Sequence, residues 1–356
     1  MTPGSVVLAA TREEAAGAAL PIAGLTVFGR ALKQLGQSPE KHVVVARDGA
    51  IVVPTPLPAN VEVRTVADGA AAAEIARSLG APLVGADVVR LDRTRFEGGL
   101  RVVDEPTRRA AEDAVFAALY RADLGFVARR LNKPISVRLT RHVLARSSIT
   151  PNQITLFAAA LGIVGCALMA TGRYLWVVLG LALEHTQSVL DGCDGELARV
   201  RFQRSAIGEW LDTFVDDGLN LALIAAVACA VRNPERSSLP SFAPIVAWTA
   251  FGMMLFYNIV TYRELIRQGE GGSVLKVRWW FTGGAEVKVM AGAGKKTLGA
   301  FLFNLGRRDV FVLVWLILAI FDRLNVVVLF AFVVAVVSFI VGAGQLVARF
   351  RGSLTR

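Results

Sequence analysis

Apolar segments fill the chain beyond Asn152, and they constrain its fold more than any other feature. Six segments can be drawn, at roughly residues 152–171, 175–190, 207–231, 242–262, 310–321 and 324–348. A helix needs about 20 apolar residues to cross the hydrocarbon core of a bilayer. Inside that core a helix satisfies its own backbone hydrogen bonds. The sequence therefore predicts an α-helical integral membrane protein, with six transmembrane helices in a domain at residues 151–350.

The first third of the chain has a different composition. The whole protein is 54% hydrophobic with a mean hydropathy of +0.51, yet residues 1–106 contain no apolar run long enough to span a bilayer. Runs such as SVVLAA and HVVVAR flank a helical segment, and APLVGADVV is typical of a further strand ending at Asp87. We expect a small α/β domain here. No signal peptide is evident, so this domain is expected in the cytoplasm.

Residues 107–150 are expected to form a linker and juxtamembrane amphipathic helices. Apolar residues recur there at roughly helical spacing, with basic residues between them; they are Val115, Leu119, Phe126, Val127 and Leu131. This pattern predicts a helix followed by an amphipathic helix on the membrane surface. Pro134 is expected to start the second helix, since a proline at the first helical position loses no needed hydrogen bond.

The distribution of basic residues predicts the orientation of the membrane part. Of a net charge of +10, segment 263–309 carries nine Lys or Arg and the link 199–204 carries three, against four in the loops expected opposite. By the positive-inside rule, both termini lie on the cytoplasmic side of the cytoplasmic membrane. The basic loops favour anionic headgroups or an anionic substrate, or set the topology alone. No nucleic-acid motif accompanies them, so nucleic acid is not an expected partner.

Four aspartates lie at helical spacing between apolar segments. Residues 191–216 fit the frame D-x2-D-G-x2-A-R-x8-G-x3-D-x3-D, with its fixed positions at Asp191, Asp194, Gly195, Ala198, Arg199, Gly208, Asp212 and Asp216. Aspartates three or four residues apart share one helix face. A charge at bilayer depth costs on the order of 3 kcal/mol, so four carboxylates need a compensating partner.

Two divalent cations would balance these four carboxylates. Oxygen ligands suit Mg²⁺ or Mn²⁺ rather than zinc. Gly195 and Gly208 let backbone or ligand approach closely, and Arg199 offers a planar fork for a phosphate oxygen. Together these residues suit the cleavage of a pyrophosphate. The alternative, a helix pair with structural ion pairs, lacks an equal set of cations within those helices.

The motif resembles the signature of the CDP-alcohol phosphotransferase (CDP-alcohol phosphatidyltransferase) family at every fixed position. The resemblance covers about residues 130–350 and implies a six-helix membrane fold, usually a homodimer, with a polar cavity open to the cytoplasm. It implies Mg²⁺ or Mn²⁺, two per site, held by Asp191, Asp194 and Asp212. Asp216 would be a further ligand or the base that deprotonates the acceptor hydroxyl. The implied CDP-binding residues are Asp191, Gly195, Ala198, Arg199, Gly208 and Asn152.

Flanking sequences narrow the branch. HTQSVLDGCDGELAR and LNKPISVRLTRHVLARSSITPNQIT are similar to the membrane half of di-myo-inositol phosphate phosphate synthases, which join CDP-inositol to inositol phosphate. His185 and Gln187 could contact substrate, although a satisfied interhelical hydrogen bond is favoured. Arg263 and Arg267 end the fourth segment, where they would grip an acceptor phosphate or anchor the membrane surface.

Those synthases often carry a fused cytidylyltransferase head, and residues 1–106 resemble a degenerate sugar-phosphate nucleotidyltransferase. In that class the first strand leads into a glycine-rich loop for the triphosphate. Here the loop reads AATREEAAGAALP, without the glycine pattern and with Glu13 and Glu14 where phosphates would sit. Asp87 is a candidate remnant of a metal position. We expect an inactive domain that serves stability, dimerisation or docking of a partner.

Three functional hypotheses stay open at this point. In the first, a CDP-inositol-like donor reacts with a polyol phosphate or a lipid hydroxyl and releases CMP. In the second, CDP-diacylglycerol is the donor, as in phospholipid biosynthesis of the phosphatidylinositol phosphate or phosphatidylglycerol phosphate type. In the third, the protein is a non-catalytic membrane scaffold whose aspartates bind a cation passively. The flanking sequences favour the first.

Overall fold

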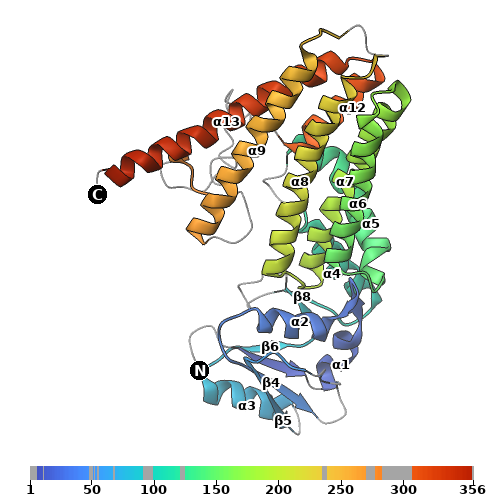
Figure 1. Cartoon of the computed structure of the whole chain (residues 1–356). Helices are drawn as coiled ribbons and strands as arrows, with labels where there is room; N and C mark the ends of the chain where they lie inside the picture. Colours follow the sequence, from blue (N-terminus) through green and yellow to red (C-terminus); the bar gives the residue numbers. More distant parts are fainter. Residues whose placement is uncertain are drawn as a thin grey trace. The chain divides into compact units, whose positions relative to one another are not determined.

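The computed structural model describes residues 6–10, 12–47, 51, 53, 56–66, 69–90, 99–120, 125–234, 239–269, 277–282 and 307–354. The chain forms two compact units (Figure 1). The sheet unit combines residues 1–120, 137–148 and 196–203. The helical unit combines residues 121–136, 149–195 and 204–356.

A four-stranded parallel sheet forms the centre of the sheet unit, in the order β5-β4-β1-β6. The strands are β1 (Val7–Ala10), β4 (His42–Arg47), β5 (Val61–Val66) and β6 (Leu83–Gly85). Both faces are covered by helices, α2 (Val27–Gly36) on one and α3 (Gly69–Leu79) on the other. Because successive strand residues point to opposite faces, Leu8 packs with Phe28 and Val7 packs with Ala72. The predicted α/β domain is confirmed.

The segment after β1 is a helix, α1 (Arg12–Ala19), so the loop expected there is wrong. Its sequence, REEAAGAA, is rich in alanine, the residue with the highest helix propensity. The hairpin β2 (Pro21–Ile22) and β3 (Leu25–Thr26) follows it.

Asp87, the candidate remnant of a metal position, is buried and already has a cationic partner. Its carboxylate lies 2.7 Å from Nε of Arg101. Arg101 belongs to β8 (Leu100–Arg101), which pairs with β7 (Val88–Val89). This ion pair therefore ties the β7–β8 hairpin together, and it explains the burial of Asp87 without a metal ion.

The linker region contains α4 (Glu105–Ala117), a π-helical turn η1 (Ala128–Asn132), α5 (Lys133–His142) and a short 3₁₀ turn η2 (Leu144–Arg146). Pro134 does not start a helix, because η1 precedes it without a break. Proline lacks the N–H that the preceding turn would use, and the N–H of Lys133 bonds Ala128 five residues back. Phe126 and Ile135 are exposed while Ser136 is buried, so the exposed side of this helix carries large apolar residues.

Six helices occupy the six predicted apolar segments: α6 (Pro151–Ala170), α7 (Tyr174–Val200), α8 (Ala206–Ala230), α9 (Ala243–Gln268), α12 (Arg308–Ile320) and α13 (Leu324–Leu354). Among the described residues, four of them (α6, α8, α9 and α13) are long and apolar enough to cross a membrane. With 13 residues, α12 is shorter than a bilayer-spanning helix, and α7 carries part of the acidic motif. The expected count of six transmembrane helices is therefore not confirmed.

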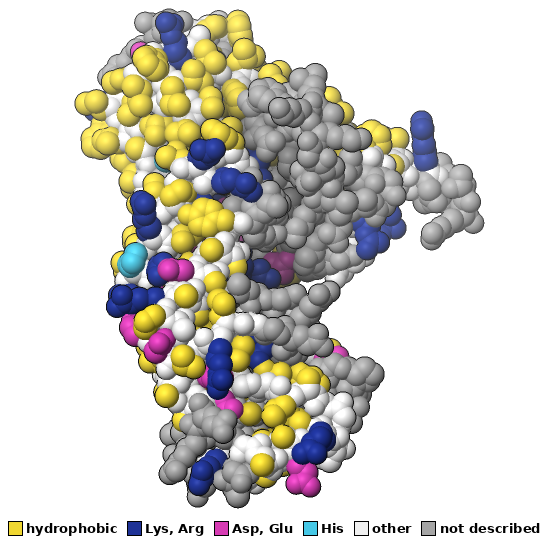
Figure 2. Space-filling view, turned by 180° about the vertical axis from the view of Figure 1, so that it is seen from behind, with side chains coloured by type: hydrophobic (Ala, Val, Ile, Leu, Met, Phe, Trp, Pro, Cys, Tyr) yellow, Lys and Arg dark blue, Asp and Glu magenta, His cyan; other side chains and the backbone are white. Residues whose placement is uncertain are grey.

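The helical unit packs around a core drawn from all six helices, with Leu181, Leu223, Val227, Trp315 and Val327 among its buried members. Small residues allow close contact between α6 and α7. A Cβ added to Gly180 would lie 2.5 Å from the carbonyl oxygen of Gly165. Large hydrophobic side chains are exposed along the same helices, and Figure 2 shows them gathered over much of the described helical surface. Such a surface suits contact with lipid.

Candidate active site

Helices α7 and α8 carry the four aspartates of the acidic frame. The short link between the two helices ends at Ser205, whose hydroxyl accepts a hydrogen bond of 3.0 Å from the N–H of Gly208. Serine at this N-terminal cap position satisfies an N–H that has no partner within the helix. The cap thereby fixes the start of α8, and Asp212 and Asp216 follow on successive turns of its first half.

Three of the four aspartates converge. Asp191 and Asp194 of α7 and Asp212 of α8 each offer a carboxylate oxygen, and these oxygens all lie within 4.8 Å of one another. The structure thus brings together residues from two helices whose proximity the spacing alone did not establish. An all-oxygen donor set of carboxylates is suited to Mg²⁺ or Mn²⁺.

The surroundings of the cluster fit a cation. The hydroxyl of Thr155, from α6, donates to one oxygen of Asp194, and the N–H of Gly195 donates to the other. Asp191 has a buried oxygen, Oδ1, with no hydrogen-bond partner among the described residues. A buried acceptor without a partner is costly. A metal ion shared by these carboxylates would supply that partner, so the residues present fit the implied metal.

Asp216 has a different environment from the other three aspartates. Its Oδ1 accepts a hydrogen bond of 2.9 Å from Nη1 of Arg308, at the start of α12. Nη2 of the same guanidinium lies 3.1 Å from Oε2 of Glu184, a fully buried residue of α7. The sequence reasoning missed both residues, because it sought cations only within the two acidic helices. A glutamate inside an apolar segment was the available signal.

The predicted CDP-binding residues are placed at helix ends. Asn152 is exposed in the first turn of α6, and a Cβ on Gly208 would lie 3.1 Å from its Oδ1. These two predicted residues are therefore adjacent, and the absence of a side chain at Gly208 permits it. Gly195 follows Asp194 directly, whereas Ala198 and Arg199 belong to the last turn of α7.

Two arginines of the basic loops are not surface residues. Arg201 is buried and donates from Nη2 to the carbonyl oxygens of Leu144, at 2.9 Å, and Ser147. Burial also lowers the pKa of Arg201 from its ordinary value. Arg308 is engaged by Asp216 and Glu184, as described above. Both arginines therefore have partners within the protein.

The hydrogen bonds expected for His185 and Gln187 are also corrected. Gln187 is fully buried, yet neither atom of its amide group has a hydrogen-bond partner among the described residues. The same holds for Nδ1 of His185. Helix packing, which a single sequence does not specify, decides whether two polar groups meet.

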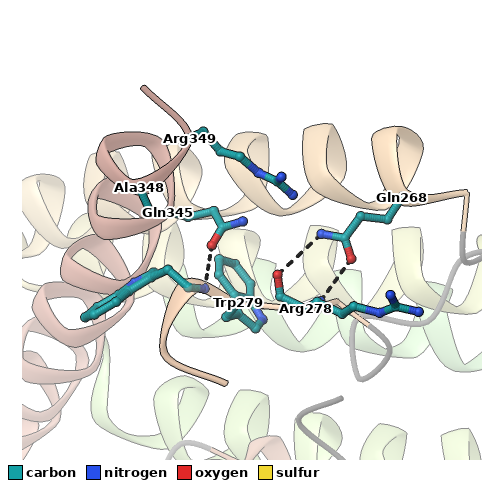
Figure 3. Close-up of a pocket in the computed structure, with 7 residues that line it drawn as sticks. Gln268, Arg278, Trp279, Gln345, Ala348 and Arg349 are labelled. Atoms are coloured by element: carbon teal, nitrogen blue, oxygen red, sulfur yellow. Dashed lines mark hydrogen bonds between the residues drawn. The ribbon is translucent and has the colours of Figure 1, made fainter. Parts of the chain in front are cut away.

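Arg263 and Arg267 lie on α9 itself and are exposed. Neither lines the pocket found further along that helix, which measures about 520 Å³ and is drawn in Figure 3. Its lining residues are Gln268, Arg278, Trp279, Trp280, Gln345, Ala348 and Arg349. The side-chain oxygen of Gln268 accepts a hydrogen bond of 3.0 Å from the N–H of Arg278, and that of Gln345 accepts one of 2.8 Å from the N–H of Trp280. These bonds hold the segment 277–282 against α9 and α13. Arg349 is already paired with the buried Glu264, at 2.7 Å.

Comparison with known sequences finds a family model that matches part of the chain. Residues 148–293 match the sequence model of the CDP-alcohol phosphatidyltransferases, and this range contains the whole acidic frame. Residues 148–293 of this chain are therefore similar to the CDP-alcohol phosphatidyltransferases. The resemblance predicted from the acidic frame is thereby confirmed.

Proteins similar to this chain agree with the predicted branch. A bifunctional IPC transferase and DIPP synthase of Archaeoglobus fulgidus is 31% identical over 159 residues, which are 44% of this chain and 31% of that protein. The same-named protein of Aquifex aeolicus is 32% identical over 162 residues, 45% of this chain and 35% of its own. The inner membrane protein YnjF of Escherichia coli is 33% identical over 109 residues, 30% of this chain and 48% of its own. The chain thus spans about a third of the length of the first two relatives.

Proposed function

We propose that this protein is a metal-dependent CDP-alcohol phosphotransferase. It would transfer a phosphoalcohol group from a CDP-alcohol to an acceptor hydroxyl and release CMP. The observation that carries the proposal is the convergence of Asp191, Asp194 and Asp212 from two helices, within a segment that matches this family. Holding three carboxylates close together costs free energy unless a cation lies between them. A scaffold protein would have no need of such an arrangement.

The three converging aspartates would hold the metal, with Asp216 as a further ligand or as the base. Mg²⁺ is the proposed ion, two per site, with Mn²⁺ as the alternative. Bound there, it would stabilise the charge that develops on the phosphates as CMP leaves. Thr155 supports this role from α6, because its hydrogen bond orients the carboxylate of Asp194.

The remaining residues of the frame have roles that follow from their chemistry. Asp216 would accept the proton of the acceptor hydroxyl, whose oxygen forms a bond to the β-phosphorus while the bond from phosphorus to the CMP oxygen breaks. Such a base contributes about 10²–10⁴-fold to the rate. The proposed CDP contacts are Asp191, Asn152, Gly195, Ala198, Arg199 and Gly208. Arg263 and Arg267, both exposed, are the proposed contacts for an acceptor phosphate.

A soluble CDP-polyol such as CDP-inositol is the proposed donor. Support comes from the relatives, four of which are named IPC transferase and DIPP synthase. CDP-diacylglycerol is the alternative donor, and the exposed apolar surface of the described helices is compatible with a lipid substrate.

We also propose that the protein forms a homodimer with both termini in the cytoplasm. The N-terminal α/β domain, at residues 1–106, would perform no nucleotidyl transfer.

The decisive experiment is CMP release by the purified full-length protein in detergent. CDP-inositol and CDP-diacylglycerol are offered separately, with Mg²⁺ and a panel of acceptors, and Asp216→Asn is the control. We expect release with CDP-inositol that is lost on chelation and in the variant. Release with CDP-diacylglycerol alone would establish the alternative donor. No release from either donor by folded protein would favour the scaffold hypothesis.

A further inference from the structure

One guanidinium joins two carboxylates in the interior of the helical unit. Arg308 directs Nη1 to Oδ1 of Asp216 at 2.9 Å and Nη2 to Oε2 of Glu184 at 3.1 Å. The side chain of Arg308 is 12% exposed, Glu184 is fully buried, and Asp216 is 36% exposed. The guanidinium of Arg308 therefore connects the buried Glu184 to Asp216, the most exposed of these three side chains.

Glu184 is fixed on its other side as well. Its Oε1 accepts a hydrogen bond of 3.1 Å from the thiol of Cys166 on α6. A Cβ on Gly165 would lie 3.2 Å from the same oxygen, so the glycine leaves the space that the carboxylate occupies. Glu184 thus connects α6, its own helix α7 and, through Arg308, α12. A buried carboxylate held by two donors is a rigid anchor.

We propose that Arg308 and Glu184 are positioning residues for Asp216. This inference rests on the proposed function and deepens it. Two residues outside the acidic frame would orient one carboxylate of the frame. Glu184 orients the guanidinium, and the guanidinium orients Asp216 by one oxygen. The second oxygen of Asp216 would take the proton of the acceptor hydroxyl or bind a metal ion.

The geometry requires arginine in particular. A guanidinium is planar and offers donors in a fixed fork, so one side chain bonds two carboxylates in defined directions. A lysine ammonium would keep the charge but not the fork. Misplacing a catalytic group by about 1 Å costs on the order of 10²-fold in rate. Position and charge are therefore separable by experiment.

Four variants of the full-length protein test the proposal: Arg308→Gln, Arg308→Lys, Glu184→Gln, and the double variant Glu184→Gln/Arg308→Gln. Each is assayed for kcat and KM of CMP release and, independently, for Mn²⁺ affinity by titration of the free-ion electron paramagnetic resonance signal. Glu264→Gln is the matched control, because among the described residues the buried Glu264 also pairs with an arginine, Arg349. It should leave Mn²⁺ affinity unchanged.

Loss of position should appear in kcat. We expect Arg308→Gln to lower kcat about 30-fold or more and Arg308→Lys about tenfold, with KM within about threefold. Glu184→Gln should lower kcat about fivefold alone and have no further effect in the Arg308→Gln background, because it acts through Arg308. Full kcat in Arg308→Lys would overturn the positioning role, and multiplication of the two single effects would overturn the role of Glu184.

The Mn²⁺ titration keeps the proposal testable apart from catalysis. Arg308→Gln removes a positive charge beside the aspartates and releases Asp216, so Mn²⁺ should bind about three- to tenfold more tightly. Arg308→Lys, which keeps the charge, should bind Mn²⁺ within about twofold of the unchanged protein. If the unchanged protein released no CMP, the proposed function would fail, but these shifts would still support the contact. Equal or weaker Mn²⁺ binding in Arg308→Gln would overturn the proposed positioning of Asp216 by Arg308. If Arg308→Gln does not fold, the kcat values of Arg308→Lys and Glu184→Gln decide the question.

Discussion

Nη1 of Arg30 donates a hydrogen bond of 2.7 Å to the carbonyl oxygen of Val200, the last residue of α7. Lys33 donates from Nζ to the next carbonyl, that of Arg201, at 3.3 Å. The ring of Phe202 lies 5.3 Å from the guanidinium of Arg30. The last carbonyl groups of a helix have no partner within it, and cations are favoured there. Within the sheet unit, α2 therefore caps the last residues of α7.

Arg30→Ala should loosen this helix end. A hydrogen bond to a charged group contributes about 1.5–3 kcal/mol to the stability of a protein. Because Arg30 is buried, we expect its bond to Val200 to contribute an amount in this range. We expect faster hydrogen exchange at the amides of residues 200–203 and a lower temperature of unfolding. Arg77→Ala, an exposed arginine of α3, is the control. Unchanged exchange in Arg30→Ala would show that the cap contributes nothing to the order of this link.

Thr155→Val should weaken metal binding while leaving the fold intact. The substitution keeps the shape of the side chain but removes the hydroxyl that donates to Asp194. Loss of a hydrogen bond to a metal ligand typically costs about 10–100-fold in affinity or activity. The measurement is the Mg²⁺ concentration for half-maximal CMP release, together with Mn²⁺ affinity. Thr186→Val is the control, since that exposed hydroxyl donates to the backbone carbonyl of Ala182 and not to an aspartate of the frame. Equal affinities in the two variants would contradict the role of Thr155.

Gly208→Ala and Gly218→Ala make a matched pair on α8. A Cβ at position 208 would lie 3.0 Å from Oγ of Ser205 and 3.1 Å from Oδ1 of Asn152, whereas nothing lies within 4 Å at position 218. We expect Gly208→Ala to raise KM for the CDP donor about tenfold, through displacement of Asn152. Gly218→Ala should keep KM and stabilise the helix by up to about 1 kcal/mol. Equal KM values would exclude this end of α8 from the donor site.

The sheet unit should lose stability in mild acid through His42. Burial lowers the pKa of His42 below its ordinary value of 6.5, while Glu40 opposes the shift. The unfolded chain then binds the proton more tightly, so the stabilisation is complete above pH 6.5 and declines as the pH falls below it. Protonation would also remove the acceptor that Nδ1 offers to the N–H of Val6, at 3.2 Å.

The measurement for His42 is the temperature of unfolding between pH 7.5 and pH 5.5. We expect a decrease in the unchanged protein and a smaller one in His42→Asn, whose side chain does not titrate in this range. The difference between the two decreases isolates the histidine from other titrating groups. Identical decreases would mean that His42 does not contribute to the pH dependence.

Local pattern was sufficient to predict the six helices of the helical unit. Apolar runs placed the six helices and the strands β1, β4 and β6, because such runs are properties of neighbouring residues, whereas β5 was not predicted. Pro134 shows the limit of such signals. A proline is compatible with a helix start and with an interrupted helix, and only the residues before it decide which one forms.

The sequence by itself determined the helical segments, the acidic frame and the family resemblance that the frame carries, since each of these depends on residue type and short-range spacing. Only the tertiary structure decided that Asp191, Asp194 and Asp212 converge and which partners the aspartates meet. Thr155 reaches Asp194 across 39 residues, and Arg308 reaches Asp216 and Glu184 across 92 and 124. Such contacts depend on which helix faces pack together, and helical periodicity describes one helix at a time. The partner of Asp216 therefore became visible only once α12 was placed against α7 and α8.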